Sequence, residues 1–243
     1  MTAISCKNLC KTFQQGDQTV VGLDHVSIEI DSEEVVCLSG PSGSGKTTLL
    51  NAMGGLDTPD SGEIRVGDLR VDLLDKGQRA DMRLNEIGFV FQAYNLIPVL
   101  TAQENIEFVM QVQGVPAELR HQKSLAILQE VGLEGLEDRR PAELSGGQQQ
   151  RVAVARAIVS EPTLVLADEP TANLDSTSAI QLIELFLELN RKLGITFVIA
   201  THDTRVMSYC RRMITMVDGK IVKDVQQDQA PLAASEHNAI SQT

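Results

Sequence analysis

Residues 40–47, GPSGSGKT, have the residue types and the spacing of a loop that binds phosphate. They match the pattern Gly, four residues, Gly-Lys-Thr, between an apolar stretch and a stretch with helical character. Glycines let successive backbone N–H groups surround phosphate oxygens, while Lys46 adds a positive charge and Thr47 a hydroxyl for Mg²⁺. A chance glycine-rich turn is the alternative, and the strand-to-helix context disfavours it. The segment therefore predicts binding of a nucleoside phosphate.

Two adjacent carboxylates, Asp168 and Glu169, end the apolar segment TLVLADE. In open α/β sheets, ligands bind at the carboxyl ends of the strands. We expect Asp168 to hold Mg²⁺ through water and Glu169 to polarise an attacking water as general base. A solvated strand end is the simpler alternative, which becomes less plausible once a phosphate loop is present in the same chain.

Two further apolar segments end in polar residues. His202 follows ITFVIAT, and Gln92 follows GFVF. A histidine in such a place is often only a satisfied polar core residue, but strand ends that converge on one phosphate favour a contact with the γ-phosphate or with the catalytic water. Gln92 can both coordinate Mg²⁺ and donate to water.

A second glycine pair opens the stretch ELSGGQQQRVAVARAIV, residues 143–159. Ser145 can cap a helix here, with Gln148 completing a Ser-x-x-Gln capping box. The N-terminus of a helix carries free N–H groups and a partial positive charge, so it also suits an anion. By itself the pattern is explained by a well-made helix start.

The elements that must position these residues alternate between strand and helix, which predicts an α/β fold with a parallel sheet. VSIEI and EVVCLSG are predicted strands, and IRVGDLRVDLL, after the turn cluster DTPDSGEI, adds strand material to a small sheet. Residues 75–159 are mostly helical apart from IGFVF, with a capping box at Thr101 and Glu104. A hairpin is predicted around Asp218 and Gly219. Residues 224–243 are polar and lack a period, so we expect them to be disordered.

Composition excludes several classes of function. The 243 residues carry a net charge of −12, with a pI near 4.8, which argues against a nucleic-acid surface. The cysteines lack the spacing of a zinc site or a disulfide framework. No run of 18 apolar residues and no signal peptide is visible, so the chain is expected to be cytoplasmic and soluble. No repeat of 20 to 50 residues is visible, which predicts one copy of the domain per chain.

The segment LSGGQ, followed closely by EPTLVLADEPTANLD, resembles the signature of ABC-type ATPases, and the resemblance covers about residues 3–223. It implies a P-loop NTPase fold with a RecA-like parallel-sheet core, an N-terminal antiparallel β subdomain and a helical insertion at about 93–159. The ATPase domain would then comprise residues 1–223, before the tail 224–243.

The resemblance also implies that two copies pack head to tail as a homodimer around two ATP molecules, so that each signature completes the partner's pocket. The trans ATP-binding residues would be Ser145, Gly146, Gly147, Gln148 and Asp175. ATP in the same chain would be bound by Phe13, which stacks on adenine in place of the usual Tyr, and by Gly40, Pro41, Ser42, Gly43, Ser44, Gly45, Lys46, Thr47 and Thr48. With Mg²⁺ as cofactor, the metal ligands would be Thr47, Gln92 and Asp168, and the catalytic residues Glu169, His202 and Gln92.

Within the family, GGLDTPDSGEI and GFVFQAYNLIPVLTAQENIE resemble the branch that includes MacB-like and LolD-like cassettes, whose membrane partners are FtsX-like. This implies a peripheral protein on the cytoplasmic face of the inner (plasma) membrane. It also implies an FtsX-like or MacB-like permease that docks at residues 93–108, with a periplasmic adaptor in some systems. Gln92 would be the hinge that senses the γ-phosphate.

Two other functions remain open from the sequence. A regulatory cassette could signal through an FtsX-like partner to cell-envelope enzymes without moving cargo, and the residues do not separate it from a transport ATPase. A DNA-repair or translation ATPase is disfavoured, because no long coiled coil fits between Gly40 and Ser145 and the chain has a single, acidic cassette.

Overall fold

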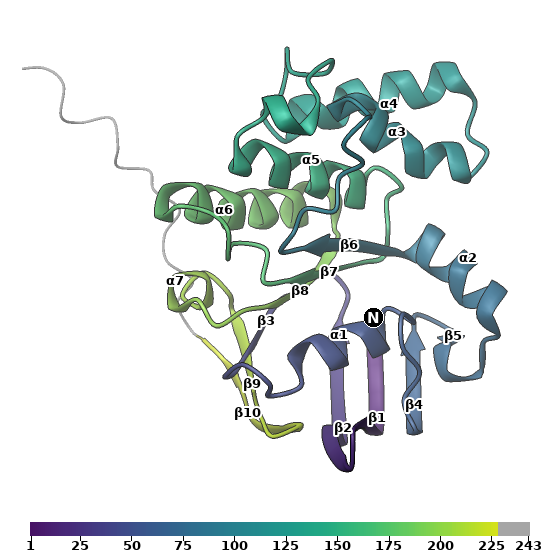
Figure 1. Ribbon diagram of the computed structural model, residues 1–243, viewed down its shortest axis with the longest axis vertical. Coiled ribbons are helices and arrows are strands. Elements are labelled where there is room, and N and C mark those ends of the chain that lie inside the picture. The colour runs from purple at the N-terminus through teal and green to yellow at the C-terminus, as the bar shows by residue number, and fades with distance from the viewer. Residues whose placement is uncertain (228–243) are drawn as a thin grey trace, which may run out of the picture.

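The computed structural model describes residues 1–227, and the predicted disorder of the tail beyond them lies outside the described residues. Figure 1 shows a small N-terminal sheet at one end, a central sheet, and a group of helices at the other end. The fold is mixed α/β, as the alternation of strands and helices predicts.

The N-terminal sheet is antiparallel and has the strand order β2-β1-β4-β5. Strands β1 (Thr2–Gln15) and β2 (Gln18–Asp31) form a hairpin, while β4 (Ser61–Val66) and β5 (Leu69–Arg70) extend the sheet on the other side of β1. The predicted strand VSIEI is the second half of β2. The predicted N-terminal antiparallel sheet is therefore confirmed.

The central sheet has the order β10-β9-β3-β8-β7-β6, and every pairing in it is parallel except that between β9 and β10. Its strands are β3 (Val35–Ser39), β6 (Ile87–Phe91), β7 (Leu164–Asp168), β8 (Thr196–Ala200), β9 (Arg212–Val217) and β10 (Lys220–Gln226). Strands β3, β8, β7 and β6 are neighbours in space although long segments separate them in sequence. Their carboxyl ends therefore meet along one edge.

The two faces of the central sheet pack into two different cores, because successive strand residues point to opposite sides. Val198 packs with helix α1 (Lys46–Met53) and the antiparallel sheet, whereas Phe197 packs with helix α6 (Ser176–Leu193). The rings of Phe197 and Phe186 stack with centroids 5.0 Å apart. Helix α1 contacts strands of both sheets, which fixes the loop that precedes it.

The remaining helices are α2 (Lys76–Glu86), α3 (Ala102–Val112), α4 (Ala117–Glu130), α5 (Gly146–Ile158) and α7 (Thr204–Met207), with a short 3-10 helix at Pro141–Glu143. Helices α3, α4 and α5 pack on one another, grouped at the end of the molecule away from the antiparallel sheet (Figure 1). The capping box of Thr101 and Glu104 is present at the start of α3. These helices lie between Ala102 and Ile158, and the bounds of the insertion at about 93–159 stay a prediction.

Two local predictions are wrong. Residues Val71–Leu73 form a 3-10 helix, not a strand, because the Asp72 carboxylate accepts from the Ile64 backbone N–H and pairs with the Arg70 guanidinium. The ordered hairpin also continues beyond residue 223, since Asp224 pairs with Ile214 in β10 and its carboxylate accepts two hydrogen bonds from Arg212. The start of the tail at residue 224 is therefore placed too early.

Candidate functional site

A cavity of about 490 Å³ lies at the carboxyl edge of the central sheet. Each predicted chemical segment reaches it from a different strand: the glycine loop after β3, the carboxylates after β7, the histidine after β8 and Gln92 after β6. The residues that line it are Phe13, Val20, Val21, Gly22, Ser42, Gly43, Gly45, Lys46, Thr47, Thr48, Gln92, Asp168, Glu169, Ala172 and His202.

The backbone of the glycine loop has a conformation and close contacts that residues with a side chain would not tolerate. Gly40 and Gly45 have φ values of 145° and 101°. A Cβ on Gly40 would lie 2.3 Å from the Met216 carbonyl oxygen, and one on Gly45 would lie 2.4 Å from the Gly22 carbonyl oxygen. Glycine is thus required here by close backbone packing as well as by φ.

Lys46 is folded back over this loop. Its Nζ donates to the carbonyl oxygens of Gly40 at 2.8 Å and Pro41 at 3.0 Å, so its charge sits above the curve of the backbone. Ser44 Oγ is buried, and among the described residues it has no hydrogen-bond partner. A glycine-rich loop that places a buried lysine beside the cavity suits an anion of several phosphates.

Thr47 and Asp168 form the oxygen-rich part of the cavity. Thr47 Oγ1 donates to Asp168 Oδ1 at 3.2 Å, and Gln92 lines the same space. Burial raises the pKa of Asp168, and the hydrogen bond from Thr47 opposes that rise. A hydroxyl, a carboxylate and an amide oxygen are hard donors, and Mg²⁺ is commonly held by one or two carboxylates together with substrate phosphates.

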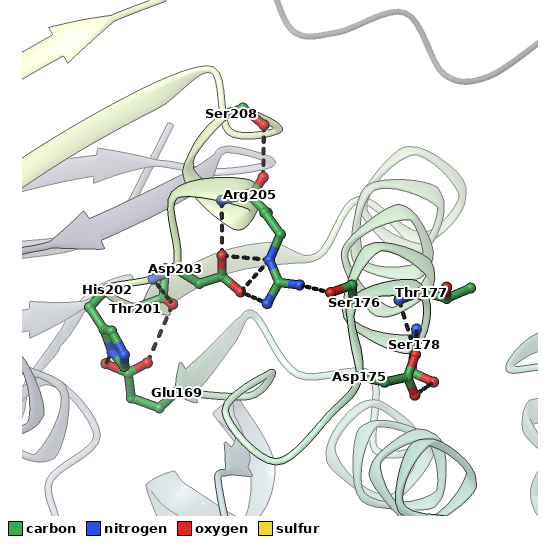
Figure 2. A network of polar contacts seen from close by, with 10 residues as sticks. All are labelled: Glu169, Asp175, Ser176, Thr177, Ser178, Thr201, His202, Asp203, Arg205 and Ser208. Carbon is green, nitrogen blue, oxygen red and sulfur yellow. Dashed lines mark hydrogen bonds and ion pairs between the residues drawn. The ribbon is translucent and has the colours of Figure 1, made fainter.

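Glu169 is held in a defined position at the cavity wall. Its φ of 46° is unusual for a residue with a side chain, and its backbone N–H donates to the Ala200 carbonyl oxygen. Glu169 Oε1 lies 2.8 Å from His202 Nδ1, and Oε2 accepts from Thr201 Oγ1 at 3.3 Å. Figure 2 shows the three side chains together. The Glu169 side chain is only 17% exposed, against 70% for His202.

Phe13 lies on β1 and also lines the cavity. Its ring is 40% exposed, and Lys11 Nζ lies 5.5 Å from the ring centroid. A Cβ on Gly22 would lie 2.6 Å from the ring, so this glycine lets the aromatic side chain lie flat against β2. The sequence prediction missed Val20, Val21 and Gly22, although the hairpin register pairs Phe13 with Val20 and would have indicated them.

The residues predicted to act in trans form a separate group. Ser145 caps α5, with Gln148 N–H donating to Ser145 Oγ at 3.3 Å and Gln148 Oε1 accepting from Ser145 N–H at 2.9 Å, so the predicted capping box is confirmed. Asp175 caps α6 by accepting from two backbone N–H groups. A Cβ on Gly147 would lie 3.3 Å from Ser178 Oγ, which places the starts of α5 and α6 side by side.

The structure thus brings together Phe13, most of the glycine loop, Gln92, Asp168, Glu169 and His202. The predicted residues that do not line the cavity are Gly40, Pro41 and Ser44 of the loop, and Ser145, Gly146, Gly147, Gln148 and Asp175. Thr201, which contacts Glu169, was not predicted. Its sequence signal is its place: it is a polar residue directly after β8 and directly before His202.

Among the described residues, no helix is both long enough and apolar enough to span a membrane. Within the same residues, no group of three His, Cys, Asp or Glu side chains is arranged to hold a metal ion.

Comparison with known proteins gives consistent relatives. The model of the family described as ABC transporter matches residues 23–172. The macrolide export ATP-binding/permease protein MacB of Sodalis glossinidius is 43% identical over 230 residues, which cover 95% of this chain and 35% of that protein. MacB of Burkholderia thailandensis is 45% identical over 214 residues, 88% of this chain and 33% of that protein. The chain spans about a third of the length of these curated relatives.

Two solved structures are similar throughout. A dimeric post-hydrolysis state of the ATP-binding cassette MJ0796 bound to ADP and Pi has a TM-score of 0.85 and 39% identity, and the match covers 92% of this chain and 98% of that chain. The structure of cbiO1 from Clostridium perfringens, part of the ABC transporter complex cbiONQ, has a TM-score of 0.83 and 29% identity, over 93% of this chain and 88% of that chain.

Proposed function

The chain belongs to the ABC transporter family of ATP-hydrolysing cassettes, and from this premise we propose that it binds and hydrolyses ATP in the cavity at the edge of its central sheet and transmits the energy to a separate membrane permease. The observation that carries the proposal is the position of Glu169. Its carboxylate is fixed by His202 and Thr201 at the wall of a cavity that the phosphate loop also lines.

Different residues of one chain bind different parts of ATP. Phe13 offers a flat aromatic face for the adenine, and the backbone N–H groups of residues 42, 43 and 45–48, which line the cavity, bind the phosphates. Lys46 exchanges its two carbonyl partners for phosphate oxygens, which bear more charge. Thr47, Asp168 and Gln92 would hold Mg²⁺, which when bound neutralises part of the charge on the β- and γ-phosphates.

Glu169 acts as the general base in this proposal. It accepts the proton of the water that attacks the γ-phosphate, and it needs no rearrangement because Thr201 and His202 already fix its two oxygens. His202 donates from Nδ1 to Glu169, so Nε2 of the neutral ring can accept a hydrogen bond from the attacking water, and it can donate to the γ-phosphate when the ring carries both protons. Gln92 lies at the start of the helical insertion and can report whether the γ-phosphate is present.

The second group of residues serves a second copy of the chain. The capping box uses the N–H groups of Ser145 and Gln148, so the start of α5 presents those of Gly146 and Gly147 at a helix N-terminus, and Asp175 lies beside it. We assign this group to the γ-phosphate bound by the partner in a head-to-tail homodimer. The similar cassette MJ0796 is dimeric in its ADP and Pi complex, which supports this arrangement.

A membrane permease is the partner that we propose outside the homodimer. The curated relatives are ATP-binding/permease proteins, and about two thirds of their length lies beyond the match. We place the docking site at residues 93–108, where Val99 and Phe108 are exposed, and the chain at the cytoplasmic face of the inner membrane. An FtsX-like permease, with or without a periplasmic adaptor, fits the sequence motifs of this branch.

The test is a Glu169→Gln variant of the purified chain. The amide keeps the size and the contact with Thr201 but cannot take a proton, so turnover should fall by about 100- to 10,000-fold while ATP still binds. A Glu134→Gln variant, which changes an exposed carboxylate outside the cavity, should keep wild-type turnover. Normal hydrolysis by Glu169→Gln would remove this residue from the role of base.

A further inference from the structure

A chain of polar contacts runs from the catalytic carboxylate to the group of residues assigned to the partner's nucleotide (Figure 2). It begins at Thr201, whose hydroxyl donates to Glu169 Oε2 at 3.3 Å and accepts from the Asp203 backbone N–H at 3.0 Å. Asp203 directly follows His202, so its position also sets the position of the histidine. The loop after β8 is therefore held against Glu169 at one end.

Arg205 holds the same loop at its other end. Its Nε and Nη2 donate to the Asp203 carboxylate, with the Nη2 contact at 2.6 Å. The Asp203 side chain is only 16% exposed, whereas Arg205 is 42% exposed. The Arg205 guanidinium lowers the pKa of Asp203 by hydrogen bonding, so the carboxylate stays charged and the pair intact.

Arg205 also reaches a different helix. Its Nη1 donates to Ser176 Oγ at 2.5 Å, at the first residue of α6. Its side chain adjoins a small apolar hollow between α6 and α7, which is lined by Ala179, Ile180, Ile183, Val206 and Tyr209. Figure 2 shows the guanidinium lying between Asp203 and Ser176, with Asp175 and Ser178 just beyond. One side chain thus joins the His202 loop to the start of α6.

The start of α6 in turn packs against α5, the helix that begins within the signature segment LSGGQ and that we call the signature helix. Asp175 accepts from Ser178 Oγ at 2.6 Å, and Ser178 is the nearest neighbour of the space beside Gly147. Arg205 therefore bonds to a segment, Asp175–Ser178, that contains both Ser178, which lies against α5, and Asp175, which caps α6. A shift of the His202 loop must move this segment or break the contacts of Arg205.

We propose that Arg205 is a positioning residue that couples the two nucleotide sites of the dimer, because it ties the γ-phosphate contact of one site to the surface that completes the other. The proposal rests on the proposed function and adds to it a route by which one site influences its twin. Arg205 touches no substrate. Its planar fork can bond two partners at once, and lysine lacks this geometry.

The experiment measures ATP turnover against ATP concentration for Arg205→Ala, Ser176→Ala and the double variant. Arg205→Ala should lower kcat by about 10-fold and move the Hill coefficient toward unity, while the ATP affinity of the monomer stays within about twofold of wild type. Ser176→Ala leaves the pair of Arg205 and Asp203 intact and should act in the same direction by about threefold, since it removes one hydrogen bond.

The double variant separates coupling from simple damage to the fold. If both residues act through one contact, the double variant should be no worse than Arg205→Ala, and Arg205→Lys should not restore cooperativity. Arg211→Ala, which removes a nearby exposed charge, should behave as wild type. Ser176→Ala places a residue that favours helix at the start of α6, so this variant should fold. It therefore still tests the coupling if Arg205→Ala does not fold.

A wild-type Hill coefficient in both single variants, or effects that multiply in the double variant, would overturn the coupling and leave the proposed function intact. A wild-type chain that binds ATP but neither hydrolyses it nor pairs in its presence would overturn both.

Discussion

The cavity and the signature helix start differ in how complete they are within one chain. The cavity has walls from six segments, and its carboxylate, histidine and lysine already contact one another or the loop. The start of α5 has a well-formed cap, but Gly146 and Gly147 present a surface and not a pocket. The comparison teaches that the first site can be derived from one chain, whereas the second acquires a function only when another molecule faces it.

Among changes outside the cavity, the largest expected effect comes from Gly147→Glu. A carboxylate at this point would repel the partner's γ-phosphate, so turnover should fall by about 100- to 1,000-fold. The nearest atoms to a Cβ here belong to the movable Ser178 side chain, and an acidic residue suits a helix N-terminus, so the fold should survive. ATP affinity of the monomer, measured by equilibrium titration, should stay within about twofold of wild type.

A mixing experiment sharpens the same contrast. Neither Gly147→Glu nor Lys46→Ala should be active alone, yet a mixed dimer contains one pocket with both Lys46 and Gly147 intact. Mixing the two chains should restore ATP trapping at one site per dimer. Loss of nucleotide affinity in the Gly147→Glu monomer would instead place Gly147 in its own chain's site.

Phe13→Ala tests the adenine-binding part of the cavity, which we do not assign to the signature residues. Loss of stacking on the base should weaken ATP binding by about 10-fold, with a smaller change in kcat at saturating ATP. Phe13→Tyr should restore affinity, because the aromatic face is kept. Phe108→Ala removes an exposed aromatic ring on α3 and should leave nucleotide affinity unchanged, as measured with a fluorescent nucleotide. An equal loss in both variants would contradict the assignment of Phe13.

The smallest effect is one of stability. Burial raises the pKa of Asp168, so the folded chain without ligand holds a carboxylate that it disfavours as an anion. Asp168→Asn keeps an oxygen that accepts from Thr47 and removes the charge, and it should raise Tm by about 2–4 °C, the change expected for roughly 1 kcal/mol. The same variant should lose Mg²⁺-dependent turnover. A lower Tm in calorimetry would show that the charge stabilises the fold.

Much of the central sheet could be predicted because the apolar runs are short and end in Gly, Asp-Glu or Thr-His. Parallel strands place such ends together, so the convergence of Glu169 and His202 follows from the pattern alone. Strand β1 is harder to find, since register shifts between Cys6 and Leu9 and between Leu9 and Lys11 break its alternation. The 3-10 helix at Val71–Leu73 depends on the bonds of Asp72, which a local pattern does not contain.

The link through Arg205 lies further from sequence reasoning. Arg205 and Ser176 are 29 residues apart, on two helices whose packing is decided by the apolar contacts between α6 and α7. A capping box is local and can be predicted from four residues, as at Ser145. A bridge between two elements needs their relative position, which only the fold supplies.

The central claim is that two chains must close on ATP, each completing the other's pocket. The most direct measurement is turnover per chain across a wide dilution series, with light scattering on the same samples. Turnover per chain should rise with chain concentration and follow the fraction of ATP-dependent dimer. Constant turnover per chain, with monomers at every concentration, would contradict it.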